Sequence, residues 1–370
     1  EEEEEEEDEV EHGSQGRGKY EKNSGLVVGT VRDRTYVSRG GKIGVFKYGD
    51  QNNLEFSTTI DTTLTAPTGA VFSPAKMMLH DQDDKMLMLD DHAPNSVFCM
   101  DLHRGEVVDE WKTAEDGFAV NDILPESKYS QLHATPTFVG LNQNTAFLMD
   151  PRQSRSEKQV NLKGFRYGRR TDPRFSCAAT TSGGDIVVAS EKGDLRLFNR
   201  KQIHDDNRNM ELKTRAKNQL LLSGNPIIGV DVTQDGSWVL ATCKTHLLVI
   251  PVRAGNICGF DKTLGAADRQ PARRLELKRE HIFEMDNNVS FTPAYFNRDV
   301  HGEERSVITS TGPYIVTWNF RKVKQGQLKS YQIKRYADNV VADQFKFGED
   351  RTVVVALADD VTVAKRVARQ

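Results

Sequence analysis

The sequence has few cysteines and no long apolar run, and both absences narrow the class of protein. It holds four cysteines in 370 residues, and no two of them have the CxxC spacing of a metal or redox site. They are Cys99, Cys177, Cys243 and Cys258. Buried reduced thiols in a cytoplasmic protein are therefore expected, rather than a disulfide framework or a metal site. No run reaches the length of a membrane-spanning helix, because Lys244 and His246 interrupt the best candidate, and the N-terminus lacks the basic and apolar regions of a secretory signal.

Motifs of known enzyme classes are missing as well. GxSxG, HExxH and a dinucleotide-binding GxGxxG after a strand do not occur, and the nine histidines show no paired spacing. The stretch Gly13–Lys19 has the GxxxxGK spacing of a phosphate-binding loop, but Tyr20 stands where a magnesium-binding Ser or Thr belongs, which favours a flexible linker. The acid-rich runs His80–Asp84 and Asp90–His92 lack the glycine turn and terminal Glu of a calcium loop, and we interpret them as solvated turns. The sequence predicts a protein that is not an enzyme and uses no cofactor.

Charge is distributed unevenly along the chain. Of the 54 acidic residues, ten lie in the first eleven positions, which leaves 44 against 50 Lys and Arg in the rest, a net charge of about +6. A run of like charge repels itself and cannot bury apolar surface, so residues 1–24 are expected to form a disordered acidic linker containing Gly and Ser. The abrupt start on seven Glu indicates a fragment that begins inside a linker of a longer protein.

From Leu26 onward, short runs of β-branched and aliphatic residues alternate with turn residues. Pro226–Val252 is the clearest stretch, with three strands separated by a Gln-Asp-Gly turn and by Lys244-Thr245. Seven segments of this kind follow one another at a period of roughly 40 to 50 residues. They run from Leu26 to Ile60, Ala75 to Lys112, Thr137 to Leu162, Phe175 to Ser223, Pro226 to Lys278, Val289 to Tyr336 and Val340 to Arg366. The sequence therefore predicts an all-β fold, a seven-bladed WD40-like β-propeller over residues 25–370.

Three details of this ring stay open at the level of sequence. The last segment shows three strands, so either the strand around Val27 completes the last blade, or that strand is the inner strand of the first blade and closure lies elsewhere. The inner strand of the third blade is only weakly indicated, around Val120 to Leu124. The region Asp205–Leu222 is the best candidate for a helix of ten or more residues, although it is polar enough to be a long loop between strands.

The three tryptophans lie within strands, which favours packing between blades over a base-stacking platform.

Two stretches, Asp185–Arg200 and Pro226–Ile250, resemble the C-terminal WD40-like propeller of the vacuolar import and degradation protein family (Vid type, number twenty-seven) and its plant relatives. The resemblance extends over Arg34–Tyr48, Met100–Lys112 and Thr137–Arg152. Ordinary WD40 repeats end strands in Trp-Asp, which this sequence lacks; Trp318-Asn319 comes nearest. The resemblance implies a cytoplasmic, non-catalytic role in targeting proteins to the vacuole, and an acidic linker before the propeller.

A basic face is predicted from propeller topology. Turns between second and third strands emerge on the same face as the connections between blades, and in this sequence several of them carry cations. The predicted partner-binding residues are Arg39, Lys42, Arg166, Arg169, Arg170, Lys192 and Lys244. Such a face suits acidic or phosphorylated protein segments, among them the chain's own acidic tail, while ordinary solvated loop charges are the plainer alternative. Nucleic acid is a weaker alternative, because a net charge near +6 falls short of a strongly basic domain.

Overall fold

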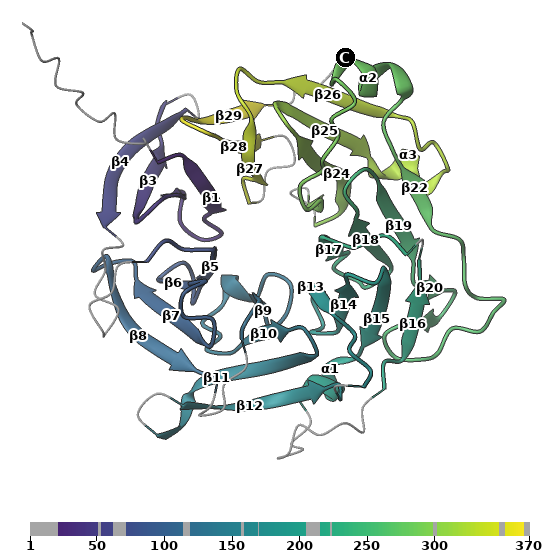
Figure 1. The fold of residues 1–370 in the computed structure, drawn as a ribbon, viewed down its shortest axis with the longest axis horizontal. Coiled ribbons are helices and arrows are strands. Elements are labelled where there is room, and N and C mark those ends of the chain that lie inside the picture. The colour runs from purple at the N-terminus through teal and green to yellow at the C-terminus, as the bar shows by residue number, and fades with distance from the viewer. Residues whose placement is uncertain are drawn as a thin grey trace, which may run out of the picture.

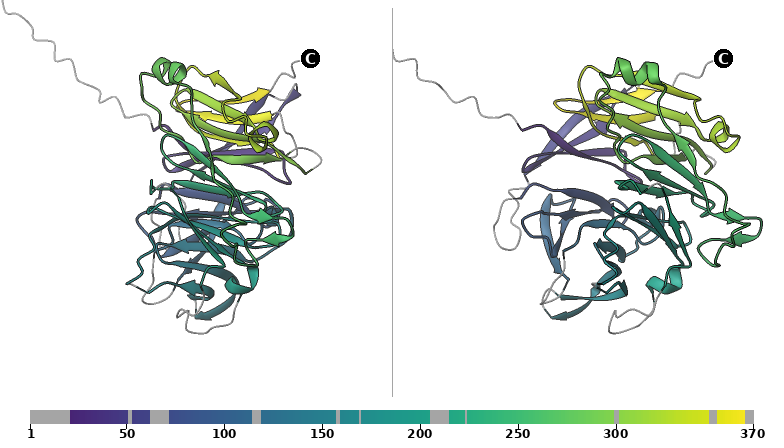
Figure 2. Two further views of the ribbon diagram at one scale, coloured as in Figure 1. Left: turned by 90° about the vertical axis from the view of Figure 1, so that its right-hand side faces the viewer. Right: turned by 45° about the vertical axis from the view of Figure 1, so that its right-hand side comes forward.

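The computed structural model describes residues 21–50, 53–61, 72–113, 119–156, 159–168, 170–204, 215–222, 224–298, 302–347 and 352–365. The predicted acidic linker, residues 1–24, lies almost wholly outside them. Small antiparallel sheets follow one another around a central opening, in chain order, as the seven blades of a β-propeller (Figure 1). Figure 2 shows the ring turned, with the first and last blades side by side.

The first three blades have four strands each, with the first strand nearest the axis and the fourth outermost (Figure 1), and one parallel pair, Lys112 with Gln159, joins the outermost strands of blades two and three into one sheet. Blade one contains β1 (Asn23–Val28), β2 (Arg34–Arg39), β3 (Lys42–Tyr48) and β4 (Leu54–Asp61). Blade two contains β5 (Lys76–His80), β6 (Lys85–Leu89), β7 (Ser96–Asp101) and β8 (Glu106–Lys112). Blade three contains β9 (Asp122–Pro125), β10 (Phe138–Asn142), β11 (Thr145–Ser156) and β12 (Gln159–Arg166), with a short 3-10 helix, η2 (Ser130–Leu132), after β9.

The remaining blades repeat the pattern, except that the last has three described strands. Blade four contains β13 (Phe175–Thr180), β14 (Ile186–Ser190), β15 (Asp194–Phe198) and β16 (Asn218–Leu221), and blade five contains β17 (Gly229–Val232), β18 (Trp238–Thr242), β19 (Leu247–Pro251) and β22 (Arg273–Leu275). Blade six contains β23 (Tyr295–Arg298), β24 (Glu304–Thr311), β25 (Tyr314–Asn319) and β26 (Tyr331–Arg335), and blade seven contains β27 (Val340–Phe345), β28 (Thr352–Leu357) and β29 (Val361–Lys365). A small hairpin, β20 (Arg253–Ala254) and β21 (Ile257–Cys258), and three short helices, α1 (Arg200–Ile203), α2 (Arg279–Glu284) and α3 (Phe320–Lys324), lie in connections.

Ring closure decides between the two alternatives left open by the sequence. β1 pairs with β2, with Val27 opposite Tyr36, so it is the inner strand of blade one; the second alternative is confirmed, and the first, in which this strand completes the last blade, is excluded. Its first residue joins the ring instead: the Asn23 amide nitrogen donates to the carbonyl of Ala358 at 2.8 Å, and its side chain donates to the carbonyl of Leu357 at 2.8 Å. Among the described residues, closure between blades one and seven therefore rests on these bonds and on packing, and no strand is shared between the two sheets.

The core lies between neighbouring blades, where each sheet stacks on the next. Between blades five and six the largest buried side chain is Trp318, which is fully buried beside Phe291 and Tyr331. Trp111 and Trp238 are half-buried against similar clusters, so the prediction that the tryptophans pack between blades is confirmed. None of the helices in the described ranges has the length and apolar character that crossing a membrane requires.

The structure corrects two local predictions and confirms a third. Blade six begins at Tyr295 rather than Val289. The amide of Phe291 donates to the turn carbonyl of Lys244 in blade five, and the amide of Thr292 donates to the carbonyl of Ser310 within β24, ahead of the regular pairing that starts at Tyr295. Within Asp205–Leu222 the described part ends in strand β16, and residues 205–214 lie outside the description. The weakly indicated inner strand of blade three is confirmed as β9.

The acid-rich run after β5 is the second correction, because Asp83 within it is not solvated. Asp83 is fully buried, and its carboxylate accepts the backbone amides of Thr30, Val31 and Arg32 at 2.7 to 2.9 Å. Three amide donors satisfy a buried charge without a metal ion. Asp90, in the second run, is also buried. Asp83 therefore fastens blade two to the first turn of blade one.

Candidate functional site

The turns between second and third strands share one face of the ring with the connections that follow each blade. In blade three the amide of Tyr167, in the connection, donates to the turn carbonyl of Asn144 at 2.7 Å. The corresponding bond of blade five joins Phe291 to Lys244 at 2.8 Å. We call this the turn face; it carries the cations predicted as partner contacts.

Four of those cations come from adjacent parts of the ring, around blade four. Arg166 ends β12, Arg170 follows it in the connection, Lys192 lies in the turn of blade four, and Lys244 lies in the turn of blade five. All four are exposed. We call this set the blade-four sector. Arg169, between two of them in the sequence, lies outside the described residues.

Part of the positive charge in this sector is already matched. The Lys192 ammonium donates to the backbone carbonyl of Asp172 and lies 4.0 Å from its carboxylate, and Arg174 forms a second ion pair with that carboxylate at 3.2 Å. Arg170 and Lys244 form no ion pair within the described part of the chain. These two exposed cations are therefore the ones with charge to offer a partner at low energetic cost.

Arg39 and Lys42 lie apart from the blade-four sector, in the turn of blade one. The guanidinium of Arg39 donates to the side chain of Asn23 at 3.1 Å and to the carbonyl of Asp359 at 3.2 Å, so it serves the closure of the ring. Lys42 is exposed. Blade two, whose turn carries Asp90 and Asp91, separates this pair from the sector. The structure thus divides the predicted basic face into two groups.

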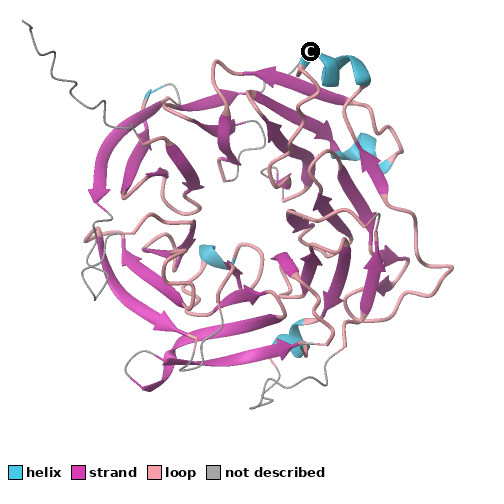
Figure 3. Cartoon of the chain, viewed as in Figure 1, coloured by secondary structure: helices cyan, strands magenta, loops and turns pink. Residues whose placement is uncertain are grey.

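The opposite face of the ring has a feature that the sequence did not reveal. The segment between β9 and β10, residues 126–137, crosses the lower part of the central opening, where η2 is drawn in cyan (Figure 3). We call it the mouth loop. Its backbone bonds Gln82 of blade two at 3.0 Å and Thr181 of blade four at 2.9 Å. Tyr129, at its centre, stacks edge-on against Phe347 after β27, with ring centroids 5.5 Å apart. The mouth loop thereby links blades two, three, four and seven.

A buried ion pair holds the mouth loop to blade five. The Lys128 ammonium lies 2.8 Å from a carboxylate oxygen of Asp231 and also donates to the carbonyl of Val232. The side chains of Lys128 and Asp231 are 12% and 16% exposed, so water screens this pair weakly. Glu304 completes the acidic surroundings, and burial raises its pKa.

A polar cavity of about 450 Å³ lies beside the mouth loop, and its walls include Lys128, His133, Ser182 and Arg200. Two of its cations already form ion pairs: Arg200 with Glu126 at 3.2 Å, and Lys128 with Asp231 as described above. These residues come from blades three and four, so no local motif could have indicated them; the twelve positions between β9 and β10 were the available signal. The geometry fits a structural brace over the axis.

The described residues include no group of three or more His, Cys, Asp or Glu arranged to hold a metal ion. Burial raises the pKa of the Cys99 and Cys177 thiols to about 12, and it also raises that of Cys243. A thiol of this kind is a poor nucleophile at neutral pH because the thiolate is the reactive form. All four cysteines are unbridged, and Cys258 is the one that is half-exposed.

The cysteines should therefore differ in reactivity. Ellman's reagent at pH 8 is expected to modify at most one thiol per folded chain within minutes, Cys258, and all four after unfolding in guanidinium chloride. The unfolded sample is the control, because it counts the thiols of the same protein that can react once burial is removed. Rapid reaction of three or more thiols in the folded chain contradicts the burial described above.

Three comparisons with known proteins agree with this architecture. Residues 21–370 match a family model described as the VID27 C-terminal WD40-like domain. The protein called vacuolar import and degradation protein 27 in Schizosaccharomyces pombe is 41% identical over 356 residues, which cover 94% of this chain and 42% of that protein. The protein of the same name in Saccharomyces cerevisiae is 34% identical over 357 residues, covering 93% of this chain and 44% of that protein. The chain thus spans less than half the length of these relatives.

Among solved structures, the chain is similar to the β-propeller domain of Cps50 (Swd1) from Myceliophteria thermophila. The TM-score is 0.64 with 10% sequence identity, over 94% of this chain and 97% of that one. At this identity the likeness shows the fold alone.

Proposed function

The chain belongs to the VID27 C-terminal WD40-like domain family, and from that premise we propose that it is a non-catalytic protein-interaction propeller acting in vacuolar import and degradation. The resemblance inferred from the sequence is thereby confirmed. The relatives' printed name supports the pathway, and the fold supports the mode of action, because propellers present many loops on a rigid frame. We further propose that it acts in the cytoplasm.

We propose that the partner is an acidic or phosphorylated protein segment and that it docks on the turn face. The observation that carries this proposal is the exposure of Arg170 and Lys244 without an ion pair in the described ranges, beside the partly matched Lys192. Clustered Arg and Lys recognise carboxylates and phosphates through charge-assisted hydrogen bonds. Lys42 on blade one is exposed on the same face but belongs to the separate group beyond the acidic turn of blade two, so it is not part of this docking site. An enzymatic role has no support in the side-chain chemistry described above.

The proposal predicts a salt-sensitive affinity for an acidic peptide. The probe is a fluorescent peptide with the sequence of Glu1–Glu11, titrated into the 370-residue chain at about 50 mM salt, where exposed charges are weakly screened. Reversing two charges, Arg170→Glu with Lys244→Glu, should weaken binding about tenfold or more, since two attractions become repulsions. Deleting residues 1–11 should strengthen binding, because a tethered acidic tail competes at high local concentration.

The matched control reverses two exposed cations of α3, Arg321→Glu with Lys322→Glu, which lie in the connection between β25 and β26 and away from the turn face. Its affinity for the probe should stay within twofold of that of the original chain. Equal losses in both double variants mean unspecific attraction to net charge and reject the turn-face site. A duplex DNA of matched charge tests the nucleic-acid alternative: tighter binding of DNA than of peptide favours that alternative.

A further inference from the structure

Blade seven has one described strand fewer than every other blade. Its sheet runs β27-β28-β29, and the strand that would lie outside β29 is not among the described residues, whereas β4, β8, β12, β16, β22 and β26 occupy that place in the other six. β29 therefore pairs on one side, with β28. An unpaired strand edge presents N–H and C=O groups that can join a further strand.

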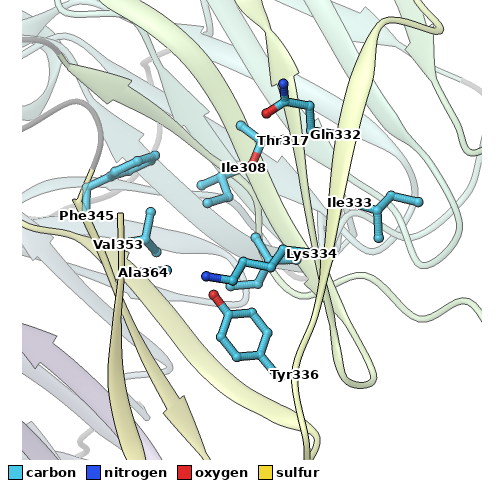
Figure 4. A pocket seen from close by; sticks show the side chains of 10 residues that line it. Ile308, Thr317, Gln332, Ile333, Lys334, Tyr336, Phe345, Val353 and Ala364 are labelled. Carbon is cyan, nitrogen blue, oxygen red and sulfur yellow. The ribbon is translucent and has the colours of Figure 1, made fainter. Parts of the chain in front are cut away.

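An apolar slot lies beside this vacant position, between the facing sides of blades six and seven. It has a volume of about 280 Å³. Figure 4 shows Phe345, Val353 and Ala364 of blade seven on one side of it, and Lys334 and Tyr336 on the other. Ile308 lies at its base. The space is small for a drug-sized ligand but has the scale of one or two apolar side chains.

The space between blades five and six shows what a fourth strand contributes to the packing between blades. Leu275 of β22 is fully buried there, and Leu277, two residues on, is nearly so. Both pack against Trp318 and its neighbours in the same cluster. Residues two apart on a strand point to the same side, so one strand supplies both side chains. A further strand placed beside β29 would supply such a pair of side chains to the outer part of the slot between blades six and seven.

The polar groups of the slot indicate the chemistry of its occupant. The hydroxyl of Tyr336 is buried without a hydrogen-bond partner in the described structure, and burial raises its pKa to about 12, so it remains a donor. The ammonium of Lys334 lies 5.2 Å from the centre of the Tyr336 ring, and the side chain of Lys334 is exposed. In the view of Figure 4 the ammonium and the hydroxyl end beside one another. One carboxylate placed between them would accept a hydrogen bond from the hydroxyl and pair with the ammonium.

We propose that an extended acidic segment of a partner protein adds to β29 as the fourth strand of blade seven, with an apolar side chain in the slot and a carboxylate facing Lys334 and Tyr336. Backbone hydrogen bonds to the edge of β29 supply affinity, and the alternating side chains supply specificity. This site is separate from the turn face, so the partner recognised here is held by strand pairing rather than by loop charges.

The test uses a peptide that carries this pattern, Thr-Leu-Thr-Glu-Thr-Leu-Thr, added to the 370-residue chain while hydrogen exchange of Val361–Lys365 is followed by mass spectrometry. Saturating peptide is expected to slow exchange in β29 at least tenfold, because its outward amides acquire partners. The same peptide with proline in place of its two central threonines cannot complete the ladder and should leave exchange unchanged. Fast exchange of β29 with and without the first peptide overturns the proposal. Slow exchange in the free chain also overturns it, because a segment of the chain itself then fills the position.

A charge variant separates this site from the turn face. Lys334→Glu should weaken binding of the peptide about tenfold, since it places a like charge beside the peptide carboxylate, while the matched variant Lys322→Glu on α3 should bind as the original chain does. Both lysines are exposed, so neither change is expected to unfold the protein. The variant Arg170→Glu with Lys244→Glu should retain full affinity for this peptide. If Arg170→Glu with Lys244→Glu abolishes binding of the peptide while Lys334→Glu retains it, the peptide binds at the turn face, and the proposed site at the slot is refuted.

Discussion

Replacing Trp318 by alanine is expected to lower the free energy of unfolding by about 3–5 kcal/mol, the largest loss from any single substitution considered for this chain. Trp318 is fully buried between blades five and six. Its ring lies 5.3 Å from that of Tyr331 and 6.2 Å from that of Phe291, and its indole nitrogen donates to the carbonyl of Leu328 at 3.2 Å. Alanine leaves a cavity and an unpaired carbonyl, and both raise the cost.

Equilibrium unfolding in guanidinium chloride, followed by circular dichroism, measures this loss. Trp318→Phe should cost less, because a ring remains and the principal loss is the indole hydrogen bond. Phe283→Ala is the control: Phe283 is 74% exposed on α2, and its loss should cost well under 1 kcal/mol. A Trp318→Ala variant as stable as Phe283→Ala shows that the packing between blades five and six differs from that described.

Replacing Lys128 by alanine is expected to cost about 3 kcal/mol, the second largest effect. The substitution removes the cation from a weakly exposed pair and leaves the Asp231 carboxylate, near that of Glu304, without a counter-charge. The effect should reach beyond blade three, because the mouth loop bridges several blades. Hydrogen exchange of β9 and β17, together with the unfolding midpoint in urea, reports both consequences.

A double variant tests whether the lost charge is the cause. Lys128→Met combined with Asp231→Asn removes both charges, and it should recover more than half of the stability lost by Lys128→Ala, since a buried pair often exchanges for neutral residues at little cost. The matched single change is Lys192→Ala on the turn face, whose exposed pair with Asp172 should contribute less than 1 kcal/mol. If Lys128→Ala and Lys192→Ala lower the free energy of unfolding by equally small amounts, the mouth loop does not brace the ring through Lys128.

The blade pattern could be predicted from the sequence because the side chains of each strand alternate between the two buried faces of its sheet, and because each strand ends at turn residues. Blade five shows this best: the strands expected to begin at Ile227, Ser237 and His246 appear as β17, β18 and β19, each shorter by one or two residues at either end. Where a hydrogen bond to a distant part of the chain determines the local structure, the sequence alone did not predict where a strand begins. The amide of Phe291 reaches a turn of the previous blade, so a strand-like stretch before β23 is not a strand.

The site was less predictable than the fold. Strand order alone assigned the cations to one face, but their neighbours around the ring depend on partners distant in sequence. Lys192 meets Asp172, twenty residues earlier, and Arg39 meets Asp359 from the other end of the chain. Asp83 looked solvated because its amide donors, near Thr30, belong to another blade. The position of a charged residue in the strand order therefore predicts the face of the ring on which it lies. Its exposure to solvent is harder to predict, because that depends on partners distant in sequence.

Proximity labelling in cells tests the central claim, that the propeller meets its partner through exposed cations of the turn face. The original chain is compared with a variant in which Arg170, Lys192 and Lys244 are replaced by Gln, with Arg321→Gln and Lys322→Gln on α3 as the control. We predict a defined set of labelled proteins that carry acidic or phosphorylated segments, retained in the control and lost in the turn-face variant. An unchanged set of labelled proteins in the turn-face variant contradicts the account.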